Sequence, residues 1–288
     1  MNKITAAMKK EANGTIALTI TIPHADVKKT WEEVFEGVVK NAEVQGFRKG
    51  KAPRKMVEEK VDKEKIREEV LKHLLPIAYT EAIKNQGIKP IINPKIHVEK
   101  LEDPSEDKDW QFTALTCEMP VIKLDKYKEA IQKVTAAATF DVAPRKIIVP
   151  GKEPVPAKFE DIVKALLENV TAEIPRILVD NETDKLLSQT LEDVKKLGLT
   201  LDQYLQSTGK NPEILRSEYR KKAENDIKLE FALLKVAEEE KIAVEEKEID
   251  EAISAAKSED EKKNLEANRY LLASILRQQK TLDFLKNL

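Results

Sequence analysis

The stretch GFRKGKAP, residues 46–53, lies between two amphipathic tracts and determines how the N-terminal part of the chain is organised. Its two glycines and one proline within eight residues interrupt a helix and predict a loop. The tract before it predicts a helix capped by Asp26, with valine and aromatic residues recurring on one face. The tract after it predicts a second helix from near Asp62 to Gly87. The loop is therefore expected to join two helices of one domain.

Two β-hairpins are predicted on either side of this helical pair. Residues 3–11 and 15–22 are joined by Asn13-Gly14, which favours a tight primed turn because both residues tolerate a positive φ angle. Residues 96–101 and 110–118 alternate in the manner of strands around the acidic turn 103–107. Four strands with two helices predict an α+β domain over residues 1–120.

The remainder of the chain is predicted to be a connector followed by a mainly α-helical domain. Four prolines within thirteen residues favour extended structure, so residues 121–157 are expected to connect two domains. These prolines are Pro144, Pro150, Pro154 and Pro156. From residue 158 onward the apolar residues recur with the helical period, which predicts a helical domain over 158–288. The expected helices span 158–170, 175–197, 211–240, 246–257 and 260–287.

The composition excludes several classes of protein. The 288 residues include 50 Lys and Arg against 52 Asp and Glu, a net charge of −2, so attraction to a nucleic acid would have to be local. Cys117 is the only cysteine and the three histidines are scattered singly, so we expect no intrachain disulfide, no metal site and no cofactor. The longest stretch without a charged side chain, residues 12–25, has only 14 residues, so we expect no membrane span and a cytoplasmic protein.

The cationic segment 47–55 carries the functional signal. Arg48, Lys49, Lys51, Arg54 and Lys55 put five cations in nine residues, with no acidic residue among them. Cations on an exposed loop can approach a phosphate backbone without being desolvated first, and the adjacent aromatic ring adds a stacking surface. The segment therefore indicates contact with RNA or with a junction of RNA and protein. The alternative is a solvated turn between two helices.

The sequence contains no motif that indicates nucleotide hydrolysis or another enzymatic activity. A phosphate-binding P-loop needs four residues between its glycines and a hydroxyl after its lysine, but three residues separate Gly46 from Gly50 and Ala52 follows Lys51. The sequence also offers no nucleophile with an adjacent base at a recognisable spacing. We therefore predict that the protein is not an enzyme.

The loop and its surroundings resemble the bacterial trigger factor family, which are ribosome-associated chaperones. The segment 46–53 is similar to the family's signature loop and lies, as in the family, after a β-hairpin and one long helix. The family's C-terminal helical domain is resembled, in order and spacing, by the run 173–180, the pairs 204–205, 208–209 and 223–224, and the run 241–246. The resemblance implies that the loop binds the large ribosomal subunit near the peptide exit, touching protein and rRNA. The residues implied are Gly46, Phe47, Arg48, Lys49, Gly50, Lys51 and Pro53.

The resemblance also implies a fold and a set of partners. The α+β domain would bind the ribosome, and the mainly helical domain, with extended arms, would hold nascent and unfolded polypeptides. Family members usually carry a prolyl isomerase domain between the two, but residues 121–157 are too few and too poor in aromatic residues to form one. The chain thus resembles a short, isomerase-less holdase without a membrane partner. Two alternatives stay open: an RNA-binding or ribosome-assembly module with a purely structural helical half, and a homodimer away from the ribosome.

Overall fold

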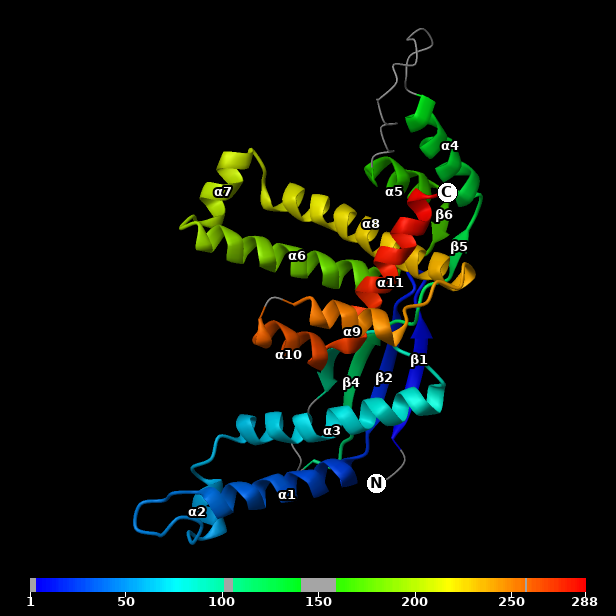
Figure 1. Cartoon of the computed structure of the whole chain (residues 1–288). Coiled ribbons are helices and arrows are strands. Elements are labelled where there is room, and N and C mark those ends of the chain that lie inside the picture. Colours follow the sequence, from blue (N-terminus) through cyan, green and yellow to red (C-terminus); the bar gives the residue numbers. More distant parts are fainter. Residues whose placement is uncertain (1–3, 101–105, 141–158, 257) are drawn as a thin grey trace. The chain divides into compact units, whose positions relative to one another are not determined.

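The computed structural model describes residues 4–100, 106–140, 159–256 and 258–288 (Figure 1). The chain divides into two compact units. The first unit comprises Met1–Met119 with Pro175–Ile177, and the second comprises Pro120–Ile174 with Leu178–Leu288. The proline-rich part of the expected connector lies outside the described residues.

The first unit is built on a four-stranded antiparallel sheet in the order β1-β2-β4-β3. The strands are β1 (Thr5–Lys10), β2 (Ile16–Ile22), β3 (Lys95–Lys100) and β4 (Trp110–Thr116). Alternation in β2 places Leu18, Ile20 and Ile22 on the core face with no exposed surface, while its threonines point to the other face. Ile20 lies opposite Phe112 of β4, which is also buried. Both predicted hairpins are confirmed.

The turn of the first hairpin differs from the predicted primed turn. The strands are connected through residues 11–15, and the Gly14 amide donates to the Glu11 carbonyl at 3.1 Å. Gly14 has a φ of 77°, whereas Asn13 has no positive φ. The Asn13 side chain instead accepts from the Thr15 amide at 3.0 Å. A longer loop with one left-handed residue therefore replaces the two-residue turn.

Helices α1 (His24–Asn41) and α3 (Lys63–Gln86) run side by side and pack on this sheet, joined by a loop and the short helix α2 (Arg54–Glu58) (Figure 1). The predicted start and end of α3 are confirmed, because Asp62 accepts from the Glu64 amide at 3.0 Å and Gly87 adopts the left-handed conformation. The predicted cap at Asp26 is wrong. The Pro23 carbonyl accepts from the Asp26 and Val27 amides, so α1 begins at His24, three residues earlier than predicted, and Asp26 is buried in its first turn.

The second unit begins at Pro120 and includes folded residues of the segment that was predicted to be a connector. Strand β5 (Ile122–Leu124) pairs with β6 (Val170–Ala172), and the helices between them in the chain, α4 (Tyr127–Phe140) and α5 (Phe159–Glu168), contribute to the same core. Residues 121–140 are thus folded, because the prolines start only at Pro144 and Tyr127 and Ile131 lie one helical turn apart on an apolar face. Strand β6 also ends the helix predicted over 158–170 early.

The described residues contain six further helices, which belong to the second unit apart from the first two residues of α6. They are α6 (Arg176–Lys196), α7 (Leu201–Thr208), α8 (Pro212–Glu239), α9 (Glu246–Ser254), α10 (Glu259–Ala267) and α11 (Arg269–Lys286). Helices α6 and α8 form a hairpin across α7, joined by a 2.7 Å hydrogen bond between the hydroxyls of Thr190 and Tyr219. The helix predicted over 260–287 is broken at Asn268, whose side chain donates to the Asn264 carbonyl at 2.8 Å. No helix in the described part of the chain is both long and apolar enough to cross a bilayer.

Candidate functional site

The segment between α1 and α2 is a folded loop held by its own backbone. The Gly50 amide donates to the Ala42 carbonyl at 3.0 Å, which closes the loop onto the end of α1. Within it, the Phe47 amide donates to the Val44 carbonyl at 3.0 Å and the Lys51 amide to the Arg48 carbonyl at 2.9 Å. These three hydrogen bonds, all within the ten residues 42–51, hold the loop in a folded shape.

The two glycines of the loop have different roles. Both are left-handed, with φ of 90° at Gly46 and 72° at Gly50, a conformation that costs a side chain energy. A Cβ atom at Gly50 would lie 2.4 Å from the Lys40 carbonyl oxygen, whereas one at Gly46 would meet nothing within 4 Å. Gly50 is therefore required by the close approach of two backbone segments as well as by its φ angle.

The inner side of the loop is apolar. Val44, Ala52 and Val57 are buried and form a small core with partly buried valines and an alanine around them. These neighbours are Val38, Val39, Ala42 and Val61. Ala52, at the position where a P-loop carries a hydroxyl, is thus a core residue of the loop. Its burial gives a structural reason for the departure from the nucleotide-binding pattern.

The outer side of the loop presents most of the predicted site residues. Six of them are exposed and lie on one continuous turn of chain: Gly46, Phe47, Arg48, Lys49, Lys51 and Pro53. Gly50 is half-buried because it forms the anchor to α1. The Phe47 side chain is 43% exposed, although it is large and apolar. The structure therefore brings the predicted residues together and leaves an aromatic ring uncovered among cations.

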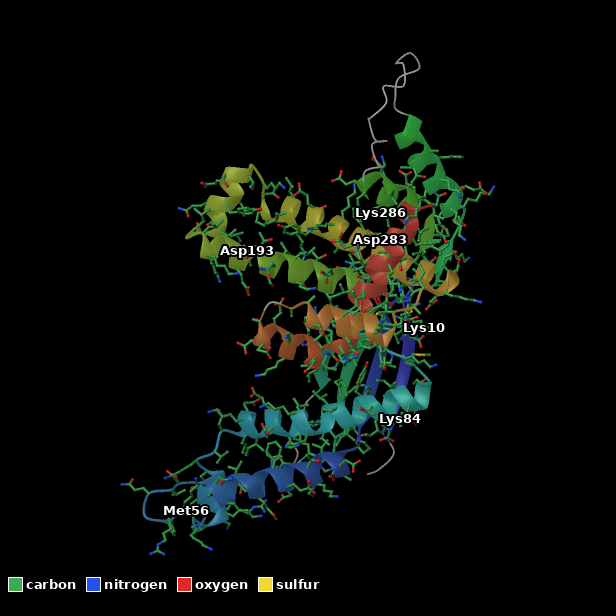
Figure 2. All side chains as sticks on the ribbon, viewed as in Figure 1. Lys10, Met56, Lys84, Asp193, Asp283 and Lys286 are labelled. Atoms are coloured by element: carbon green, nitrogen blue, oxygen red, sulfur yellow. The ribbon has the colours of Figure 1, made fainter. Side chains whose placement is uncertain are left out.

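One exposed apolar residue near the loop was not predicted from the sequence. Met56 on α2 is 41% exposed and lies a few residues beyond the loop (Figure 2). Its position in a five-residue helix gives too short a pattern to distinguish a buried face from a free one. Phe47 and Met56 are the two large exposed apolar side chains of the segment 42–61.

The five cations of the segment are not equivalent. Arg54 donates to the Glu32 carboxylate on α1, and its guanidinium lies 4.8 Å from the centre of the Phe35 ring. The hydrogen bond to Glu32 raises the pKa of Arg54, so this group stays charged. Lys49 forms a longer ion pair of 3.8 Å with Glu43. The remaining three, Arg48, Lys51 and Lys55, form no ion pair with any described residue.

A groove of about 1010 Å³ opens between α1 and α3 in the same unit. Its floor is apolar and its rim is charged, with one ion pair between Lys29 and Glu33 at 4.0 Å. The apolar residues that line it include Val34, Val38, Val44, Val61, Leu74 and Ile77. Ile77 is 46% exposed there. The groove can accept a few apolar side chains.

The helices of the second unit expose two groups of apolar side chains. The first, here named the tip cluster, lies where α6 ends and α7 begins and comprises Leu191, Leu197, Leu199 and Leu201, with exposed fractions from 36% to 75%. The second, named the α11 cluster, comprises Tyr270, Leu271 and Ile275, which are 91%, 59% and 53% exposed. Exposed patches of this kind mark surfaces that bind other apolar groups. Periodicity alone did not separate them from core positions.

The described residues offer no group of histidine, cysteine, aspartate and glutamate side chains that could hold a metal ion. Cys117 is fully buried, and burial raises the pKa of its thiol to about 11. A thiol with so high a pKa is a poor nucleophile at neutral pH. Cys117 is therefore a core residue.

Comparison with known proteins assigns both halves of the chain to one family. The model described as "Bacterial trigger factor protein (TF)" matches residues 4–147, and the model of its C-terminus matches residues 156–287. The trigger factor of Staphylococcus carnosus is 37% identical over 125 residues, which are 43% of this chain and 28% of the relative. The trigger factor of Bacillus cytotoxicus is 37% identical over 136 residues, which are 46% of this chain and 31% of the relative. The matched regions span less than a third of these relatives.

A solved structure extends the similarity of fold over the whole chain. This structure is described as "Promiscuous Substrate Recognition in Folding and Assembly Activities of the Trigger Factor Chaperone". It matches with a TM-score of 0.63 over 98% of this chain and 99% of the solved chain. The two sequences are 14% identical, so this likeness shows the fold alone. The two family models together with this fold establish that the chain belongs to the bacterial trigger factor family.

Proposed function

We propose that this protein is a cytoplasmic chaperone that binds the ribosome through the loop 46–53 and holds nascent or unfolded polypeptides on the helices of its second unit. The observation that carries the proposal is the folded loop, which exposes Phe47 beside Arg48 and Lys51, two cations that form no ion pair with any described residue. Family membership supports the partner, the large ribosomal subunit near the peptide exit, with its protein and rRNA surfaces.

A ribosomal partner is supported by a local group of cations on a chain whose net charge is close to zero. The net charge of −2 gives the chain no general attraction to RNA. Arg48 and Lys51, which lack ion-pair partners among the described residues, can replace counterions on phosphates. The exposed Phe47 ring supplies an apolar contact to a base or to a protein side chain.

Ribosome co-sedimentation of the triple variant F47A/R48A/K49A tests the proposed contact between the loop and the ribosome. These side chains are exposed, so the variant should unfold at the same temperature as the parent protein. Ribosome binding should be lost, and partial variants should flatten the logarithmic salt dependence by roughly 0.7–0.9 per phosphate contact. Undiminished binding of the triple variant would assign the ribosome contact elsewhere.

The holdase function is supported by the tip cluster and the α11 cluster. An unfolded client offers many apolar side chains, and burying each one against these surfaces contributes on the order of 1–2 kcal/mol. Several weak contacts give micromolar binding without sequence selectivity, since the client loses conformational freedom on binding. Suppression of aggregation of an unfolded client in a ribosome-free assay tests this. No suppression would favour the alternative of an RNA-binding or ribosome-assembly module.

The proposed function does not include prolyl isomerase activity. The two family-model matches leave only residues 148–155 between them, and residues 127–140 are used by α4. A protease-coupled assay with a short proline peptide tests this. A cis/trans isomerisation rate that rises with protein concentration would contradict the proposal.

A further inference from the structure

We infer that Arg54 is a positioning residue, which fastens α2 to α1 and thereby fixes the shape of the loop 46–53, rather than a cation that contacts phosphate. The inference deepens the proposed function, on which its ribosome experiment rests. Its structural part depends only on the fold of the first unit.

Arg54 joins α2 to α1 through its contacts with Glu32 and Phe35, which are here named the Arg54 latch. It is the first residue of α2, directly after Pro53, which ends the loop. Its guanidinium donates to Glu32 and covers the ring of Phe35, and both partners lie about one helical turn apart on α1. Phe35 is itself buried in the core of the first unit, so the latch is attached to a rigid element.

The loop is therefore anchored near both of its ends. The hydrogen bond from Gly50 to Ala42 closes its first part, and the Arg54 latch holds its last part. A five-residue helix such as α2 has little stability of its own, because nucleation of a helix is unfavourable. Without the latch, the position of α2 would depend on the packing of the small apolar core that contains Ala52 and Val57.

The existing contacts of Arg54 also make it a poor phosphate ligand. To reach a phosphate, the guanidinium would have to exchange its charged hydrogen bond with Glu32 and its ring contact with Phe35 for the new partner. Lys55, the next residue, has the same charge, is exposed and forms no ion pair with any residue that the structure describes. Two adjacent cations of the same segment thus have different roles.

The first experiment measures hydrogen exchange of the Gly50 amide, which reports opening of the loop because this amide donates to Ala42. R54Q should raise the exchange rate by about 3- to 10-fold, the effect of losing one surface ion pair and one cation–π contact. The matched control K55Q should leave the rate unchanged. The charge-swapped variant E32R/R54E should restore part of the protection, because it re-forms the ion pair but not the contact of residue 54 with the Phe35 ring.

The second experiment measures binding to bacterial large ribosomal subunits over a range of salt concentrations. R54Q should weaken binding by a few fold and leave the slope of log affinity against log salt unchanged, since no phosphate contact is lost. The swap E32R/R54E should recover part of the lost affinity, which a direct contact of Arg54 with phosphate would not allow.

Each outcome decides the inference. A slope that flattens by roughly 0.7–0.9 in R54Q, with unchanged exchange at Gly50, would make Arg54 a phosphate ligand and overturn it. If R54Q and K55Q raised the exchange rate of the Gly50 amide equally, the inference would also be overturned, because the effect would then depend only on the loss of a positive charge. If the parent protein fails to bind ribosomes, the proposed function fails, and the exchange experiment still decides the role of Arg54.

Discussion

The sheet of the first unit and the α6–α8 hairpin of the second use apolar residues in opposite ways. The seven residues of β2 bury four large aliphatic side chains in one core with α1 and α3. The hairpin has helices of 21 and 28 residues, yet its own core cluster contains only Val179, Ala223 and Ile227 as buried members. Its tip exposes four leucines instead. Buried apolar side chains are thus concentrated in the first region and exposed ones in the second.

The largest effect should come from a core substitution in the sheet. Phe112 is 1% exposed and pairs with Ile20, so Phe112→Ala should leave a cavity and lower the free energy of unfolding by about 3–5 kcal/mol. Leu199→Ala at the tip, where the side chain is 41% exposed, should change it by less than about 0.5 kcal/mol. Urea unfolding of both variants measures the difference. Similar losses for the two variants would abolish the contrast between the regions.

The tip cluster should matter for binding where it does not matter for stability. Replacing Leu197, Leu199 and Leu201 together by serine should weaken binding of a permanently unfolded client by roughly tenfold or more, because each leucine loses an apolar contact. A fluorescence titration at low and high salt measures the affinity, which should be nearly independent of salt in the parent protein.

A matched control for the tip variant lies in the groove of the first unit. Ile77→Ser removes one comparably exposed apolar side chain from α3 and should change client binding little. A stronger loss from Ile77→Ser than from the triple tip variant would move the main client surface to the groove between α1 and α3. Release of the client by moderate salt would contradict apolar holding altogether.

In its packing, the loop 46–53 resembles the sheet of the first unit rather than the α6–α8 hairpin. Gly50→Ala should cost about 1–3 kcal/mol of stability, since the new Cβ meets the Lys40 carbonyl oxygen and the φ angle of 72° is strained for alanine. Gly46→Ala has a similar φ cost but open space around it, so it should cost only about 1 kcal/mol. Thermal unfolding of the two variants compares them. Equal losses would mean that the φ angle alone accounts for both glycines.

The sequence predicted those elements whose determinants are local. Alternation fixes β2, and the Asp62 cap with Gly87 fixes both ends of α3. The start of α1 was missed because the Pro23 carbonyl satisfies the amides that Asp26 was expected to cap. Helix α4 was missed because the prolines downstream dominated the composition of its segment.

The candidate site shows the same division between local and distant determinants. Phe47 and its neighbouring cations were predicted from adjacent residues, and the structure places them together on the outer side of the loop. The role of Arg54 depends on Glu32, which lies 22 residues away, so no local pattern could separate it from Lys55. The tip cluster was equally hidden, because exposure of a leucine on an amphipathic helix depends on which other helices cover it.

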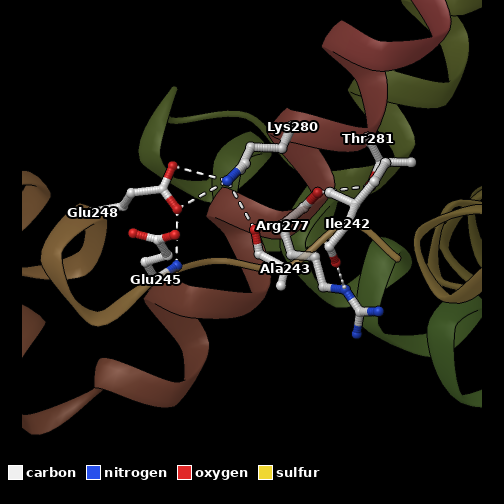
Figure 3. Close-up of polar contacts among 7 residues, drawn as sticks. All are labelled: Ile242, Ala243, Glu245, Glu248, Arg277, Lys280 and Thr281. Carbon is white, nitrogen blue, oxygen red and sulfur yellow. Dashed lines mark hydrogen bonds and ion pairs between the residues drawn. The ribbon is translucent and has the colours of Figure 1, made fainter. Parts of the chain in front are cut away.

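The smallest predicted effect concerns a polar contact that holds the connection from α8 to α9 against α11 (Figure 3). Lys280 donates to the Ala243 carbonyl at 2.8 Å and to both carboxylate oxygens of Glu248 at 2.9 Å. Arg277 donates to the Ile242 carbonyl at 2.9 Å from the same helix. Lys280→Met should therefore lower the Tm at neutral pH by roughly 2 °C. Lys196→Met is the control, because Lys196 pairs only one turn away with Asp193 at 3.3 Å and should change the Tm less.

The pH dependence of this difference gives a sharper test than its size. The hydrogen bond from the Glu245 amide, and then the contact with Lys280, lower the pKa of Glu248 from its ordinary value of 4.5. A lowered pKa in the folded state contributes stability above pH 4.5, and this contribution is lost as the pH falls through the folded pKa. Lys280→Met raises that folded pKa, so the Tm difference between the parent protein and the variant should be present at pH 7 and shrink as the carboxylate is protonated. Thermal scans from pH 7 down to about pH 3 measure it. A difference that stays constant over this range would show that Lys280 acts through the Ala243 carbonyl and its own packing, and that Glu248 adds nothing to the contact.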